Sequence, residues 1–190
     1  MNSLRSMSIS RRLWLILIVA VLMLLTLGLL MLKQIHGDLY QAKRQQTQHV
    51  VQTASGVLAY YQNLEKTGVL TREAAQQQAL SAVRGLRYDH DDYFWINDLT
   101  PVMIMHAANP KLDGQNLSAI RDPDGFAVFN EFVILAKAKG AGIVNYRWPK
   151  PGADAPVEKT SYIQLFEPWG WIIGSGVYVD DCLLYTSDAA

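Results

Sequence analysis

The hydrophobic pattern of the chain opens with an unbroken apolar run. Residues 13–32, LWLILIVAVLMLLTLGLLML, carry no charge, and Thr26 is their only polar side chain. A helix of this length, at about 1.5 Å per residue, spans a hydrocarbon core of roughly 30 Å. We therefore predict a transmembrane helix over 13–32. A cleaved signal peptide is the alternative, but its apolar region is usually shorter and ends in small residues.

The cations that flank this run bear on its orientation. They are Arg5, Arg11 and Arg12 before it, and Lys33, Lys43 and Arg44 after it. The two counts are equal, but Arg11 and Arg12 adjoin the run and the segment before it is short. The positive-inside rule then favours a cytoplasmic segment over 1–12 and an exported domain over 33–181.

After the apolar run the pattern becomes that of a long amphipathic helix over 34–67. Its apolar positions recur at spacings of four and three, as in a heptad seam, at Val50, Ala54, Val57, Tyr61 and Leu64. Because the domain that follows is small, we expect part of this helix to face a second subunit in a homodimer. A helix packed only on its own domain is the alternative.

A second helix follows a break in the chain. Gly68 is typical of a left-handed helix end, Thr71 of an N-cap, and Glu73 of a first helical turn. The expected apolar stripe of this helix consists of Ala75, Ala79, Val83 and Leu86.

From residue 92 the period becomes that of strands. Strands are expected over 93–97, 102–107, 142–148, 158–166 and 171–179, with a helix over 126–140. The first two strands are joined by a short turn containing Pro101, and the short links between the others favour antiparallel neighbours. The predicted fold is α+β, with a five-stranded antiparallel sheet behind a long helix.

Composition excludes several function classes. The 190 residues have zero net charge and no basic stripe, so a nucleic-acid partner is not expected. Cys182 is the only cysteine, which rules out an internal disulfide. The sequence DHDD at 89–92 offers metal ligands, but consecutive side chains diverge and no second cluster completes a shell, so we expect neither a metal nor another cofactor.

Three segments together resemble a known family. They are DDYFWINDLTPVMIMHAANPKLDGQNLS, GIVNYRWPKPG and KTSYIQLFEPWGWIIGSGVYVDD. Over about 34–181 they are similar to the single Cache sensor domain, of the sCache 2 type, found in bacterial methyl-accepting chemotaxis proteins, histidine kinases and cyclases. The resemblance implies a periplasmic, PAS-like domain on the inner membrane that recognises small ligands, commonly short organic acids. It does not extend to residues 182–190, CLLYTSDAA, which we interpret as a truncated end with a foreign tail.

Aromatic residues and a histidine on neighbouring strands are the candidate ligand-binding groups. They are Tyr93, Trp95, His106, Tyr146 and Trp148. Trp and Tyr supply an apolar wall with a polar tip, and a carboxylate also needs a cation. Lys159 and Arg87 are the candidate cations, and the family pattern adds Tyr162, although strict alternation puts Lys159 and Tyr162 on opposite faces.

Alternation also assigns the residues around this site. Val102, Ile104 and His106 are expected on one face, while Phe94, Ile96, Met103 and Met105 are expected in the core. Trp169 and Trp171 are interpreted as core residues. Gly174 and Gly176 are interpreted as points of close backbone approach.

These observations favour a membrane-anchored sensor of an acid such as acetate, propionate, pyruvate or lactate, bound directly or through a periplasmic binding protein. The output domain would be that of a chemoreceptor or, alternatively, of a kinase or cyclase. A periplasmic enzyme using His106 is a weaker alternative, because the chain has no nucleophile elbow, zinc-spaced histidine pair or paired-carboxylate motif, and we name no catalytic residue. A dimerisation domain that binds no ligand is the third possibility.

Overall fold

The computed structural model describes residues 8–89 and 91–180, and the chain divides into two compact units, 1–41 and 42–190. Helix α1 (Ile9–Lys66) begins in the first unit and ends in the second. The predicted cytoplasmic segment 1–12 lies partly outside the described residues. The predicted tail 182–190 with Cys182, and also His90, lie wholly outside them.

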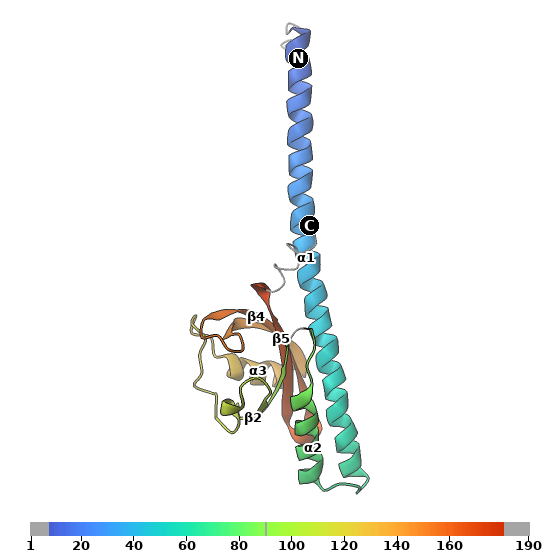
Figure 1. Cartoon of the computed structure of the whole chain (residues 1–190), viewed down its shortest axis with the longest axis vertical. Coiled ribbons are helices and arrows are strands. Elements are labelled where there is room, and N and C mark those ends of the chain that lie inside the picture. Colours follow the sequence, from blue (N-terminus) through green and yellow to red (C-terminus); the bar gives the residue numbers. More distant parts are fainter. Residues whose placement is uncertain (1–7, 90, 181–190) are drawn as a thin grey trace. The chain divides into compact units, whose positions relative to one another are not determined.

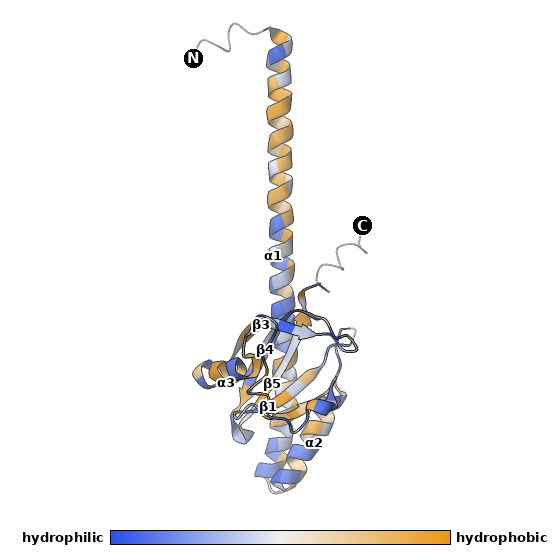
Figure 2. Cartoon of the chain, turned by 90° about the vertical axis from the view of Figure 1, so that its left-hand side faces the viewer, coloured by the Kyte–Doolittle hydropathy of each residue, from blue (hydrophilic) through white to orange (hydrophobic). Residues whose placement is uncertain are grey.

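The first unit is characterised by its apolar helix surface. Side chains of residues 13–32 are all exposed, and Figure 2 shows the hydrophobic colour running along this part of α1. The hydroxyl of Thr26 donates to the carbonyl of Met23 at 2.9 Å, so the helix itself satisfies this polar group. Among the described residues, α1 is the one helix long and apolar enough to cross a membrane, with a mean hydropathy of 3.1 over an 18-residue stretch.

The second unit contains the sheet and the helices that cover it. Its helices are α2 (Arg72–Gly85), α3 (Val128–Lys139) and the short η1 (Pro110–Leu112) and η2 (Glu167–Trp169). Its strands are β1 (Phe94–Asp98), β2 (Met103–His106), β3 (Ala141–Pro149), β4 (Pro156–Phe166) and β5 (Trp171–Tyr178). The strands form one antiparallel sheet in the order β2-β1-β5-β4-β3, which confirms the predicted α+β fold.

Two apolar clusters cover the two faces of this sheet. The first joins α1 and α2 to one face and includes Val51, Leu58, Ala79, Ile96 and Ile173. The second joins α3 to the other face and includes Trp95, Met103, Phe132, Ile163 and Ile172. Figure 1 shows the resulting layers, with α2 beside the C-terminal part of α1 on one side of the sheet and α3 on the other. Trp169 and Trp171 belong to the first cluster, as expected.

The predicted face assignment in β2 is wrong at one point. A bulge interrupts the β1–β2 register, so that Ile96 pairs with Met105 but Asn97 pairs with Met103. The extra residue reverses the alternation, since a bulge places two residues of one strand opposite one of the other. Met103 and Met105 consequently lie in different clusters, and Ile104 packs beside the first cluster instead of sharing a face with His106.

The heptad-like seam of α1 packs within its own domain. Ala54 is buried in the first cluster, and Val50, Val57 and Tyr61 are partly buried against it. The seam therefore has a partner in the chain itself. This packing within one chain does not test whether the protein forms a homodimer, so the homodimer stays a prediction.

The start of α2 provides a first mutational test. The Thr71 hydroxyl accepts a hydrogen bond from the Ala74 N–H at 3.2 Å, which confirms the predicted N-cap. We expect Thr71→Ala to lower the free energy of unfolding by about 1 kcal/mol, because an amide of the first turn loses its acceptor. Thr53→Ala is the matched control, since Thr53 is exposed within α1 and its hydroxyl donates to the His49 carbonyl of the same helix. Equal stabilities of the two variants in chemical denaturation would contradict this role of Thr71.

Candidate functional site

A buried lysine lies on the second face of the sheet. Lys159 on β4 is only 1% exposed. Its ammonium donates to the hydroxyls of Tyr93 at 2.9 Å and Tyr178 at 3.3 Å. It also lies 4.3 Å from the Tyr93 ring centroid, 4.5 Å from that of Tyr178 and 5.6 Å from that of Trp95. Such contacts between a cation and aromatic faces are favourable.

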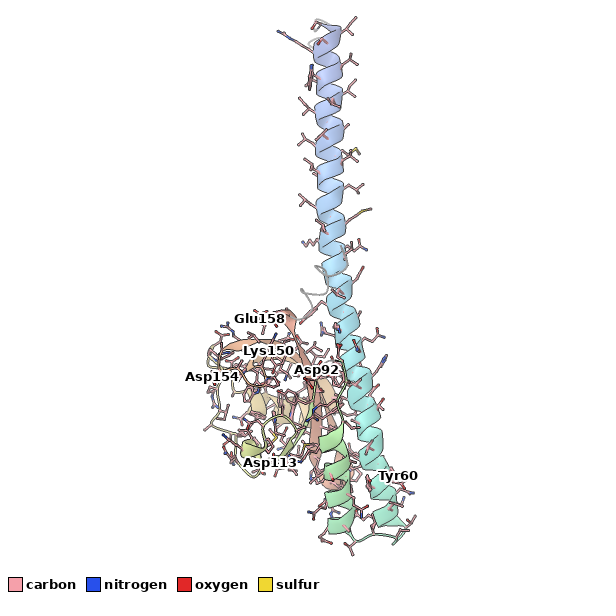
Figure 3. All side chains as sticks on the ribbon, in the orientation of Figure 1. Tyr60, Asp92, Asp113, Lys150, Asp154 and Glu158 are labelled. Carbon is pink, nitrogen blue, oxygen red and sulfur yellow. The ribbon has the colours of Figure 1, made fainter. Side chains whose placement is uncertain are left out.

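Strand register explains why these side chains meet. Lys159 pairs with Tyr146 on β3 and with Tyr178 on β5, and cross-strand partners share a face. Trp95 on β1 pairs in the same way with His106 on β2. We call the six residues brought together here the lysine–aromatic cluster: Tyr93, Trp95, His106, Tyr146, Lys159 and Tyr178. In Figure 3, Glu158 marks the exposed neighbour of Lys159 on β4.

His106 is held as a neutral hydrogen-bond donor. Its Nδ1 accepts from the Asn109 N–H at 2.8 Å, which leaves the proton of the neutral ring on Nε2. The ring lies 4.9 Å from that of Tyr93. Burial, and then the charge of Lys159, lower the pKa of His106 from 6.5 to about 4, although Asp113 acts in the opposite direction. At neutral pH the His106 ring is therefore uncharged.

The tyrosine hydroxyls are oriented by further partners. Tyr178 donates to the Pro149 carbonyl at 2.8 Å, so its oxygen is left to accept from Lys159. The Tyr146 and Ser161 hydroxyl oxygens lie 3.0 Å apart. Burial raises the pKa of both Tyr146 and Tyr178, which keeps them protonated.

Two features of the cluster point to an anionic ligand. Within the described residues, the five ion pairs found involve other cations, and none joins a carboxylate to Lys159. The buried Nε1 of Trp95 also has no hydrogen-bond partner there. Buried charges and buried donors are normally paired. The cluster thus offers a cation and an unused N–H to an anion, with aromatic rings around both.

The remaining predicted site residues lie elsewhere. Trp148 is half-buried, with its ring 6.2 Å from that of Tyr146, and flanks the cluster. Tyr162 lies on the opposite face, in the first cluster, as alternation requires. Arg87 donates to the backbone carbonyls of Arg84, Leu86 and Ala107 and is likewise outside the cluster.

Sequence reasoning missed Tyr178. The residue lies on the same face of β5 as Gly174 and Gly176. Its position opposite Lys159 follows from the β4–β5 register, which the sequence alone does not give. Gly174 leaves room for a neighbouring side chain. A Cβ atom at Gly174 would lie 2.5 Å from Cζ2 of Trp95, so the indole occupies the space of the missing side chain. The close neighbour at Gly174 is thus a side chain, whereas the predicted close backbone approach is found at Gly176, where a Cβ atom would lie 2.7 Å from the Thr160 carbonyl oxygen.

The acidic segment before β1 contains three aspartates and a histidine. The structure describes Asp89, Asp91 and Asp92 but not His90. Asp89 forms an ion pair with Lys43 of α1 at 2.7 Å. This carboxylate therefore ties the segment to α1.

Comparison with known families decides the assignment. A family model described as dCache_2, a Cache domain, matches residues 31–188. The chain belongs to the Cache domain family. The predicted family is thereby confirmed, and the described part of this Cache domain has a single five-stranded sheet.

Two relatives are longer proteins that contain a similar domain. This Cache domain is 81% identical over 181 residues to the methyl-accepting chemotaxis protein McpP of Pseudomonas putida strain KT2440, covering 95% of this chain and 33% of that protein. It is 35% identical over 117 residues to the sensor histidine kinase MctS of Rhizobium johnstonii strain 3841, covering 62% of this chain and 25% of that protein. The chain thus spans about a third of the first relative and a quarter of the second.

Two solved structures also resemble this Cache domain. One is described as "Structural basis for carboxylic acid recognition by a Cache chemosensory domain"; it is 72% identical, with a TM-score of 0.73, and the match covers 76% of this chain and 98% of that one. The other is described as "Periplasmic sensor domain of chemotaxis protein"; it is 44% identical, with a TM-score of 0.73 and coverage of 74% and 97%.

Proposed function

We propose that this chain is the extracytoplasmic sensor part of a chemoreceptor and that it binds a short monocarboxylic acid in the lysine–aromatic cluster. The observation that carries the proposal is the buried Lys159, which has hydroxyl and aromatic neighbours but no carboxylate ion-pair partner among the described residues. A carboxylate would supply the missing charge, and charge-assisted hydrogen bonds are among the strongest available to a ligand.

The neighbouring groups give each part of such a ligand a role. One carboxylate oxygen accepts from Lys159, and the other accepts from the unpartnered Trp95 Nε1 or from the Nε2–H of His106. The rings of Tyr93, Trp95 and Tyr146 surround the short alkyl part, which favours acids of two or three carbons. Trp148 lies at the edge of this site, while Tyr162 and Arg87 have no part in it.

The similarity to a chemotaxis protein and to a carboxylic acid-binding Cache structure supports the same proposal. The apolar part of α1 would anchor the chain in the bacterial inner membrane and place the sheet in the periplasm. The second candidate for the output domain is a histidine kinase, because the relative MctS is a sensor histidine kinase. We further propose that the sensor works as a homodimer, in which acid binding shifts the balance between two arrangements of α1.

Calorimetric titration of the purified chain in detergent tests the ligand class. We expect heat of binding with acetate, propionate, pyruvate or lactate, and none with acetamide, the uncharged analogue of acetate. Succinate should also fail, because its second carboxylate would be desolvated without a cation. Flat titrations for all four acids would contradict direct binding. Heat that appears only when a periplasmic binding protein is added would indicate carrier-mediated sensing.

A further inference from the structure

The carboxylate of Asp113 connects the end of β2 to α2. Its Oδ1 accepts from the backbone N–H of His106 at 2.7 Å, and its Oδ2 accepts from the Arg84 guanidinium at 2.6 Å. Asp113 follows η1 directly and lies seven residues after His106, so the bond closes the loop between them. Figure 3 shows Asp113 at the end of the sheet that lies next to α2.

A second bond ties the same two elements together. The guanidinium of Arg87, just after α2, donates to the carbonyl of Ala107 at 3.2 Å and to those of Arg84 and Leu86 at 2.8 and 2.7 Å. Arg84 therefore holds His106 through Asp113, and Arg87 holds Ala107 directly. This arrangement fixes the backbone that carries the His106 ring.

Helix α2 is in turn packed on α1. Ala75, Ala79 and Val83 of α2 are fully buried in the first cluster together with Val51 and Leu58 of α1. Close-packed helices transmit small shifts, because their interface cannot be compressed. A path of direct contacts thus leads from His106 through Asp113 and Arg84 to α2, and from α2 to α1.

We propose that Asp113 is a positioning residue, which with Arg84 holds His106 in the acid-binding geometry and couples acid binding to α2. The inference rests on the proposed function, since it assigns a role to residues outside the lysine–aromatic cluster. The Arg84 and Asp113 side chains are 39% and 26% exposed. An ion pair with this exposure contributes little to stability, because water screens it. Its removal is therefore expected to change ligand affinity more than folding.

A double-mutant cycle on the full chain tests the proposal with propionate as the probe. Asp113→Asn keeps an oxygen for the His106 N–H but loses the charge facing Arg84, and Arg84→Met leaves Asp113 intact. Each is expected to raise the Kd for propionate roughly tenfold, a usual size for coupling between sites. The double variant should show little further loss, because both substitutions break the same link. Arg84→Lys should recover part of the affinity.

Arg72→Met is the matched control at the other end of α2. Arg72 is 51% exposed and lies 3.4 Å from Glu65 in another surface ion pair. We expect this variant to bind propionate with unchanged Kd. Hydrogen exchange provides a readout that a purely structural role would not change: propionate should slow exchange of the amides of α2 in the wild type and in Arg72→Met, but not in Asp113→Asn.

The outcomes separate this proposal from the function on which it rests. Wild-type binding with an unchanged Kd in both Asp113→Asn and Arg84→Met would overturn the positioning role and leave the proposed function standing. If Asp113→Asn fails to fold, Arg84→Met decides alone, because it leaves the bond to His106 in place. A wild type that binds none of the acids would overturn the proposed function and this proposal with it.

Discussion

Lys159→Met is expected to abolish acid binding without unfolding the protein. Methionine has a similar length and retains the apolar contacts with the surrounding rings, but it removes the cation that a carboxylate needs. Loss of one partner of a buried charge pair weakens binding by about 2–5 kcal/mol, so we expect the Kd for acetate or propionate to rise at least about 30-fold. Calorimetry of the wild type and the variant measures this directly.

Thermal unfolding separates lost binding from lost folding. A ligand at 100 times its Kd stabilises the folded state by about 2.7 kcal/mol, which the variant should no longer show. Its unliganded midpoint should equal or exceed that of the wild type, since replacing a buried charge by an apolar side chain is often neutral or stabilising. Lys137→Met removes an exposed lysine of α3 and should bind normally. Propionate affinity in Lys159→Met within threefold of the wild type would refute this role of the lysine.

The stability of the protein should fall between pH 6.5 and 4 because of His106. Its folded-state pKa is lowered to about 4, first by burial and then by Lys159, with a smaller contribution from Arg84 and an opposing one from Asp113. Above pH 6.5 the ring is neutral in both states. As the pH falls towards 4, only the unfolded state takes up the proton, and below 4 both states do. The shift corresponds to a stabilisation of about 3 kcal/mol, which is fully present above pH 6.5 and absent below pH 4.

His106→Asn isolates this contribution. An asparagine oxygen takes roughly the position of Nδ1 and can accept from the Asn109 N–H, but it does not titrate. Between pH 7 and pH 4 the free energy of unfolding should fall in both proteins. We expect the fall to be about 3 kcal/mol smaller in His106→Asn than in the wild type. His49→Asn, on the exposed surface of α1, should behave like the wild type. Parallel stability curves for His106→Asn and the wild type would show that His106 does not titrate as described.

The fold was largely predictable because local patterns determine it. Thr71 and Gly68 mark helix ends through their own backbone and side-chain chemistry, and the structure places the N-cap at Thr71 and a positive φ of 74° at Gly68. The strands were recognisable from their period of two and their aromatic and branched residues. The bulge in β1–β2 was not predictable, because it depends on how two strands align and not on either strand alone.

The candidate site was predictable only where alternation was sufficient. Tyr93 and Trp95 share a face by strand period, and Lys159 and Tyr162 are separated by the same rule. Assigning Tyr178 to the site required the register between β4 and β5, and no local sequence pattern supplies that register. Arg87 resembled a ligand cation in sequence, but carbonyl groups at the end of α2 and at Ala107 are its acceptors in the fold.

The approach of Trp95 to Gly174 has a consequence for comparing receptors of this kind. The indole fits because the neighbouring strand has no side chain at that position. The placement of the indole is therefore specified by Trp95 and by Gly174, and of these two residues only Trp95 would contact a bound acid. A receptor with the same ring but a bulkier residue at the other position would have to tilt the ring away. Under the proposed function, a methyl group at position 174 would therefore alter the acid site without itself contacting the ligand.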